Sequence, residues 1–89
     1  MIKLSTALTM IDRCKRSREV FGVMFFLSKP PYGVRKIERA MTRPQPKGRF
    51  EVTDKYVYLK DLDRQSFVQF RKRLLLAVQI GSGEWMEVE

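Results

Sequence analysis

Histidine is absent from this 89-residue sequence, cysteine occurs once, and no apolar run is long. Without histidine the chain lacks the commonest general base and the commonest metal ligand. One thiol can form neither an intramolecular disulfide nor a zinc site of the usual Cys/His type, and it is typical of a protein from a reducing compartment. We therefore expect a cytoplasmic protein with no metal site, no signal peptide and no membrane-spanning segment.

Groups that could carry catalysis are equally sparse. Ser66 has no histidine to activate it, the carboxylates are scattered, and the chain has no glycine-rich phosphate loop. Cys14 lies among arginines, which would lower the pKa of a thiol, although such a cysteine is more often a small buried apolar residue. We expect neither enzymatic activity nor a cofactor.

Positive charge is what the chain has in excess, and it is unevenly distributed. The sequence carries 18 Lys and Arg against 10 Asp and Glu, a formal net charge of +8. Residues 1–49 hold 12 of the cations and 3 of the acids, whereas residues 50–89 hold 6 and 7. A lopsided basic surface attracts polyanions by electrostatic steering and counterion release, although many small proteins are basic only for solubility. The length favours a single domain over residues 1–89.

Residues 5–18 are predicted to form a short helix. Leu4, Leu8 and Ile11 recur at helical spacing, and Ser5 or Thr6 can cap the N-terminus. Four cations crowd the last turns, where they can complement the helix dipole or form an edge that contacts phosphate. They are Arg13, Lys15, Arg16 and Arg18.

The rest of the chain is predicted to consist of strands and turns. The apolar segment 19–28 is typical of a buried strand, and Gly22 within it indicates a bulge. A proline-containing turn leads to residues 34–42, which we interpret as a second strand, with a short helix as the competing interpretation. Residues 43–49 are a basic, proline-rich loop that is either a connector or a basic finger beside a binding surface. Further strands are expected at 50–53, at 56–62 and at the acidic C-terminal edge, 84–89, where Trp85 would pack on the barrel.

Residues 63–80 fit two structures. A capped helix closed by Gly81 would place apolar residues three or four apart. A strand would alternate an apolar face with a half-polar face, as an antiparallel strand with one wet side does. The half-polar face would hold Phe67, Gln69, Arg71 and Arg73, followed by Leu75 and Ala77.

A family resemblance favours the strand. The segment YVYLKDLDRQSFVQFRKRLLLAV, residues 56–78, is similar to the hairpin of small SH3-like β-barrels of the kind seen in WYL domains and in short phage-type proteins. The shared pattern is an aromatic-aliphatic strand ending in Asp, a short turn, an aromatic-Arg pair, and then a charged and an aliphatic residue. Residues 20–46 are similar to the first hairpin of such proteins, so the resemblance covers residues 19–80. Two positions depart from the pattern, because Lys72 replaces an acid and Tyr56 replaces the WYL tryptophan.

The resemblance implies a mainly β fold, namely a small SH3-like open barrel of about five strands with a short N-terminal helix. Together with the charge distribution it predicts a small nucleic-acid-binding protein that contacts the phosphate backbone of DNA or RNA and acts as a phage or bacterial regulatory factor. If phage-encoded, it would work in the cytoplasm of a bacterial host. The alternative is a phage-type interaction protein that binds and inhibits a host polymerase or defence complex through exposed edge strands. A helix-ended α/β fold resembling single-stranded-DNA coactivators would keep the nucleic-acid function.

The candidate site is centred on the half-polar face of residues 63–80. Phe67 among guanidinium groups suits base stacking flanked by phosphate contacts. In the competing interpretation Phe67 belongs to the core and the arginines pair with Asp61 and Asp63 across the hairpin. The candidate nucleic-acid-binding residues are Arg13, Lys15, Arg16, Arg18, Tyr32, Arg35, Lys36, Arg39, Arg43, Lys47, Arg49, Phe67, Gln69, Arg71 and Arg73.

Overall fold

A computed structural model of the protein describes residues 1–43 and 55–89. These residues form one α-helix and six strands, which confirms a mainly β fold with an N-terminal helix. In chain order the elements are α1 (Leu4–Ser17), β1 (Phe21–Phe26), β2 (Val34–Thr42), β3 (Tyr56–Asp61), β4 (Ser66–Arg71), the 3-10 turn η2 (Lys72–Leu74), β5 (Leu75–Ile80) and β6 (Met86–Glu87). The described helix is neither long nor apolar enough to cross a membrane.

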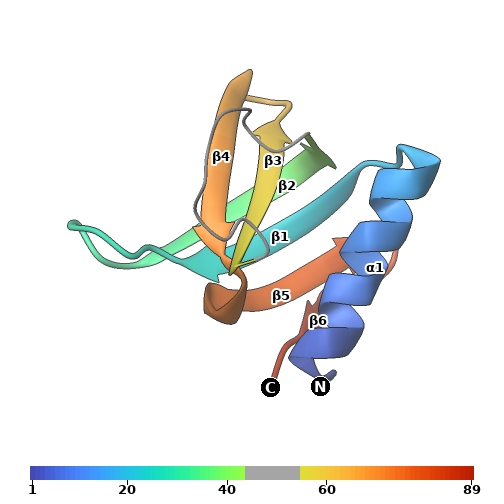
Figure 1. Cartoon of the computed structure of the whole chain (residues 1–89), viewed down its shortest axis with the longest axis horizontal. Helices are drawn as coiled ribbons and strands as arrows, with labels where there is room; N and C mark the ends of the chain where they lie inside the picture. Colours follow the sequence, from blue (N-terminus) through green and yellow to red (C-terminus); the bar gives the residue numbers. More distant parts are fainter. Residues whose placement is uncertain (44–54) are drawn as a thin grey trace.

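The strands form one antiparallel sheet in the order β4-β3-β2-β1-β5-β6. The sheet is strongly curved, so that β3 and β4 lie across the direction of β1 and β5 (Figure 1). Phe25 of β1 stacks on Phe70 of β4 with ring centroids 4.1 Å apart, although two strands separate them in the sheet order. The concave side therefore holds the core, where Leu59, Val23 and Val78 are fully buried.

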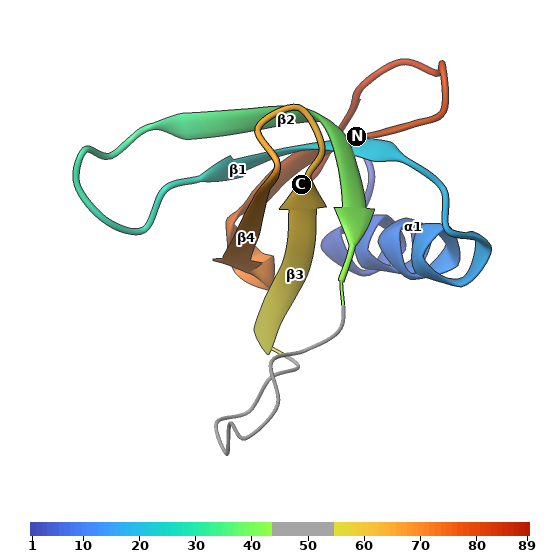
Figure 2. The same cartoon turned by 90° about the horizontal axis from the view of Figure 1, so that it is seen from above.

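Helix α1 covers the part of the sheet built by β2 and β5, as Figure 2 shows. It buries Ala7, Ile11 and Cys14, which recur at helical spacing. It ends because Arg18 adopts a left-handed conformation (φ 57°) and the next N–H donates to the carbonyl of Cys14 at 3.0 Å. The expected side-chain cap is wrong: the helix begins after Lys3, which makes no side-chain capping hydrogen bond.

A β-bulge interrupts β1, as the glycine in this strand predicts. The pairing of β1 with β2 shifts register between Phe21 and Val23, around Gly22. A Cβ atom at Gly22 would lie 2.8 Å from Cη2 of Trp85, so only glycine leaves room for the indole. The C-terminal edge strand is also confirmed, because β6 pairs with β5. The predicted strand at 34–42 is observed as β2, and its helical alternative is wrong.

Residues 63–80 form strands, as the resemblance favours, but the prediction of one continuous strand is wrong. They divide into β4, which pairs with β3, and β5, which pairs with β1, with η2 between them. The turn changes which residues face the core, so Leu75 and Ala77 are buried rather than lying on the half-polar face. A corner is needed because the chain leaves one edge of the curved sheet and joins β1 on its far side. The strand expected at 50–53, and all of the basic loop except Arg43, lie outside the described residues.

Candidate nucleic-acid interface

The outer face of the β3–β4 hairpin combines aromatic and cationic side chains. Alternate residues Val57, Leu59, Val68 and Phe70 are buried in the core, so their neighbours in both strands point outward. The antiparallel register then places three outward pairs side by side. They are Tyr56 with Arg71, Tyr58 with Gln69, and Lys60 with Phe67.

Arg43, which follows β2, lies across this face. Its guanidinium carbon is 5.3 Å from the ring centroid of Tyr58 and 5.0 Å from that of Phe67. Its Nε–H donates to the carbonyl of Leu59 at 3.2 Å, and its backbone N–H donates to the carbonyl of Tyr58 at 3.0 Å. The Arg43 side chain is thereby held in place over two rings by both hydrogen bonds and cation–π contacts.

A second cation–π contact extends the arrangement along the hairpin. The guanidinium carbon of Arg71 is 5.9 Å from the ring centroid of Tyr56, and the rings of Tyr56 and Tyr58 are 6.3 Å apart. We call the set Arg43, Tyr56, Tyr58, Lys60, Phe67, Gln69 and Arg71 the aromatic–arginine face.

The ring of Phe67 is accessible on this face, with 71% of the residue exposed. The interpretation that places Phe67 in the core is therefore wrong. The seven members of the face include three cations and no acid. Asp61, the acid of β3, belongs to the opposite, core-facing side and is only 4% exposed. Among the described residues, no acid forms an ion pair with these three cations, so the face presents positive charge beside aromatic rings.

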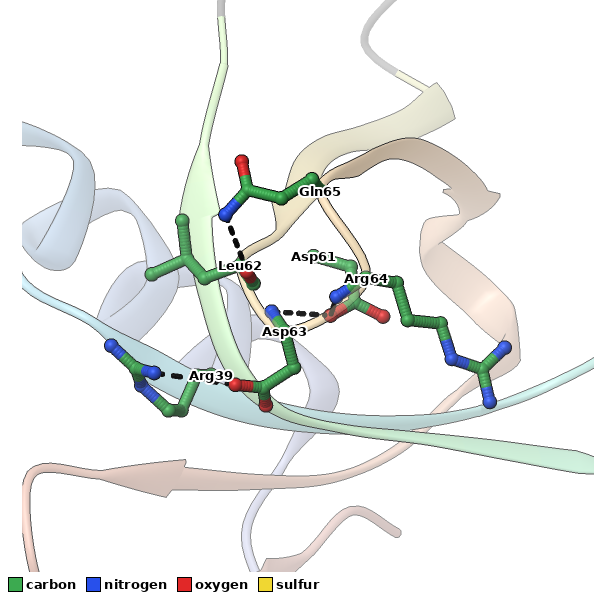
Figure 3. A network of polar contacts seen from close by, with 6 residues as sticks. All are labelled: Arg39, Asp61, Leu62, Asp63, Arg64 and Gln65. Carbon is green, nitrogen blue, oxygen red and sulfur yellow. Dashed lines mark hydrogen bonds and ion pairs between the residues drawn. The ribbon is translucent and has the colours of Figure 1, made fainter.

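The carboxylates of the hairpin turn pair with β2 and not with β4. Figure 3 shows the pair of Asp63 with Arg39 and the hydrogen bonds of the turn. Asp61 accepts hydrogen bonds from the backbone N–H groups of Asp63 (3.1 Å) and Arg64 (3.3 Å), and pairs with Arg35 at 3.3 Å. Asp63 pairs with Arg39 at 3.2 Å. Two of the candidate binding residues, Arg35 and Arg39, are therefore engaged in holding β2 to the β3–β4 turn.

The other predicted site residues of the N-terminal half, five cations and Tyr32, are not gathered on one surface of the described structure. Lys36 pairs with Glu38 at 3.6 Å, and its Nζ lies 5.1 Å from the ring centroid of Trp85. Tyr32 is 74% exposed in the turn between β1 and β2. On the helix side Arg16 pairs with Asp12 at 3.2 Å. Arg13 is exposed on the helix, and Lys47 and Arg49 lie outside the described residues.

Lys15 and Arg18 approach the aromatic–arginine face from the helix. Lys15 and Arg43 line a cavity of about 260 Å³ that also reaches Tyr56 and Tyr58. Lys15, Arg18 and Arg43 line a second, neighbouring pocket. Lys15 is therefore placed near the hairpin, and Arg18 near Arg43.

Arg73 does not share the β4 surface with its predicted partners, because it lies in η2, after the strand has ended. It remains near Arg71, since both line a groove of about 920 Å³ beside the end of β4. Sequence reasoning missed Tyr56, Tyr58 and Lys60 as site residues. Period-two alternation within 56–62 carried the signal, but only the register with β4 shows that they flank Phe67 and Arg71.

Cys14 is a buried apolar residue and not a reactive thiol. It is 2% exposed, and burial, followed by the charge of Glu19, raises the pKa of its thiol. In the part of the chain that the structure describes, no three Cys, Asp or Glu side chains are grouped so that they could hold a metal ion.

Comparison of the chain with protein-family models, with curated proteins and with solved structures gives no match. The similarity to SH3-like barrels therefore stays a prediction, and the geometry of the aromatic–arginine face carries the functional argument.

Proposed function

We propose that this protein binds nucleic acid, DNA or RNA, on the aromatic–arginine face. The observation that carries the proposal is the Phe67 ring, 71% exposed, with the guanidinium of Arg43 5.0 Å from its centroid. Exposing a large apolar ring to water is unfavourable, and a base stacked on the ring would bury it. Such stacking contributes about 1–3 kcal/mol of binding free energy per base. Arg43, Lys60 and Arg71 lie beside the rings, where they would contact the flanking phosphates.

The proposed contacts would distinguish little between different base sequences. Aromatic stacking accepts every base, and contacts from Arg and Lys to phosphate carry no sequence information. Gln69 is the one amide of the face, and it is exposed between the rings of the hairpin where it could bond to a base edge. We therefore expect a weak sequence preference and an affinity that falls steeply with salt.

The test is fluorescence anisotropy with labelled DNA and RNA oligonucleotides over a range of salt concentrations. Phe67→Ala should lose about 1–3 kcal/mol of binding free energy, because one stacking ring is removed. Arg43→Ala/Arg71→Ala should bind much more weakly than Arg13→Ala/Arg16→Ala, a matched control that removes the same number of charges from the outer side of α1.

Equal losses in the two double variants would contradict the proposal, because binding would then follow net charge alone. Unchanged affinity of Phe67→Ala would also contradict it, since the ring would make no contact with a base.

The finer fold assignment and the biological role belong to the same proposal. Stacking of Phe25 on Phe70 across the sheet supports an SH3-like open barrel, because it draws β1 and β4 together as a barrel requires. Within that assignment the protein acts as a phage or bacterial regulatory factor. A solution structure with the strand crossover of an SH3-like barrel would support the assignment, and a flat sheet would refute it.

A second candidate function, docking on a host protein, is favoured by the position of β4 at the edge of the sheet that the described residues form. The N–H of Arg43 donates to Tyr58, so Tyr58 directs its backbone groups towards β2. Tyr58 lies opposite Gln69, and the backbone groups of Phe67, Gln69 and Arg71 therefore point away from β3. A strand of a partner protein could pair with these groups.

Two substitutions at one position separate this second candidate from nucleic-acid binding. Gln69→Pro removes an outward N–H and leaves the pairing with β3 intact, whereas Gln69→Ala keeps the N–H and loses only the amide. Strand addition predicts that a nuclease-resistant partner is lost with proline and kept with alanine. Loss with both substitutions, or with neither, would argue against it.

A further inference from the structure

A cationic groove adjoins the aromatic–arginine face at the end of β4. It lies between the turn at 27–31 and the end of the hairpin, and its volume is about 920 Å³. In Figure 1 the end of β4 lies beside the end of β1, and the turn that follows β1 lines the groove together with residues of β4 and η2. Its described lining includes Lys29, Arg71 and Arg73, and no acid.

The groove and the face form one continuous surface. Tyr56, Gln69 and Arg71 belong to both. A ligand that leaves the rings of Tyr58 and Phe67 along β4 therefore enters the groove past Gln69 and Arg71, and no acid is among the described residues of the face or of the groove lining. Three cations that share one groove repel one another, and a ligand that carries repeated negative charge relieves that repulsion.

We infer that the nucleic acid is single-stranded, with its bases on the rings of the aromatic–arginine face and its phosphates continuing into the groove beside Lys29 and Arg73. The inference rests on the proposed function and specifies its ligand. The rings stand on the surface of a sheet, and in a duplex the faces of the bases are already stacked on their neighbours. Only an unpaired strand offers base faces to such rings at no cost of unstacking.

The dimensions of the site indicate a short footprint. Phe67 and Arg71 are four residues apart in β4, about 13 Å at about 3.3 Å per residue. The groove volume lies within the range of pockets that hold small ligands, so it takes a few backbone units. We expect a site of about four nucleotides, at the lower end of the range for small nucleic-acid-binding barrels.

The experiment measures anisotropy with oligothymidylates of increasing length and with a duplex of matched length, each over a salt series. The groove variant is Lys29→Ala/Arg73→Ala, which leaves the aromatic–arginine face untouched, and the charge-matched control is Arg13→Ala/Arg16→Ala. Circular dichroism and urea unfolding confirm that each variant folds. All four cations are exposed in the structure, so we expect folding to be unaffected.

We expect single strands to bind at least tenfold more tightly than the duplex, with affinity levelling off near the predicted footprint. The groove variant removes two cations, and each phosphate contact on a single strand contributes about 0.7 to the steepness of log K against log salt. The slope should therefore become about 1.4 less negative. Phe67→Ala should lower affinity and leave that slope unchanged, since the ring carries no charge.

Two results overturn the inference while the proposed function stands: equal binding of duplex and single strand, or a groove variant that behaves like the helix control. Absence of binding to any polynucleotide at low salt overturns both the inference and the proposed function.

Discussion

Replacing Asp61 with alanine should lower the free energy of unfolding by about 3 kcal/mol. Asp61 is 4% exposed and accepts from the backbone N–H groups of Asp63 and Arg64 and from Arg35. Breaking a buried ion pair on one side costs about 3–5 kcal/mol, and each hydrogen bond lost to a buried partner adds to that cost. The Arg35 side chain is 28% exposed and can regain water, which places the total at the low end of that range.

Asparagine at the same position separates the two contributions. Asp61→Asn keeps an oxygen that can accept from both backbone N–H groups of the turn, and it removes the charge that faces Arg35. We expect a cost of about 1 kcal/mol, close to that of a single charge-assisted hydrogen bond. Asp63→Ala is the surface control, because the pair of Asp63 with Arg39 is half exposed and should contribute less than about 1 kcal/mol.

Urea unfolding followed by the fluorescence of Trp85, the single tryptophan, measures all three variants. The dependence on urea should keep its slope while the midpoint moves, as expected for a change in stability alone. Equal destabilisation by asparagine and alanine would show that the hydrogen bonds to the turn contribute nothing. A loss below about 0.5 kcal/mol in both would refute the reasoning about the buried network.

Three further predictions test the packing. Gly22→Ala should destabilise the fold by about 1–3 kcal/mol and shift the tryptophan emission, because the new methyl meets the indole, whereas Gly33→Ala has open space and should be near neutral by thermal unfolding. Phe70→Ala should lower the free energy of unfolding in urea by about 3–5 kcal/mol, because it removes a ring stacked in the core, whereas Phe67→Ala should lower it by less than about 1 kcal/mol. Similar losses in the two variants would show that the assignment of inner and outer faces is wrong. Burial raises the pKa of the Cys14 thiol, so the contribution of the neutral thiol to the free energy of unfolding should be present at neutral pH and lost as pH rises through that raised pKa. Cys14→Ala should not show this loss.

Local patterns predicted most of the elements. Helical spacing of apolar residues was sufficient for α1, and enrichment in aromatic and β-branched residues was sufficient for β1 and β3, because each pattern reflects burial within a single segment. For β2 the pattern favoured a strand but left a short helix open. The predicted helix cap was wrong because the helix begins after Lys3, so that Ser5 and Thr6 lie inside its first turn.

The candidate site was predictable only in part. Strand alternation alone placed Phe67, Gln69 and Arg71 on one surface. Bringing Arg43 and Tyr58 to the same place required the pairing of β3 with both neighbours. The same long-range pairing brought acids to two of the predicted arginines of β2, which no local pattern could indicate.

The amino-acid sequence by itself determined the N-terminal helix, the apolar strands β1 and β3, and the concentration of positive charge in the first half of the chain. It left residues 34–42 and 63–80 open between helix and strand. The tertiary structure alone decided which cations meet acids, which meet rings, and where the last long strand breaks at η2. The physical reason is that alternation is a property of neighbours along the chain. Strand partners and sheet curvature depend instead on contacts between distant segments, such as that of Phe25 with Phe70.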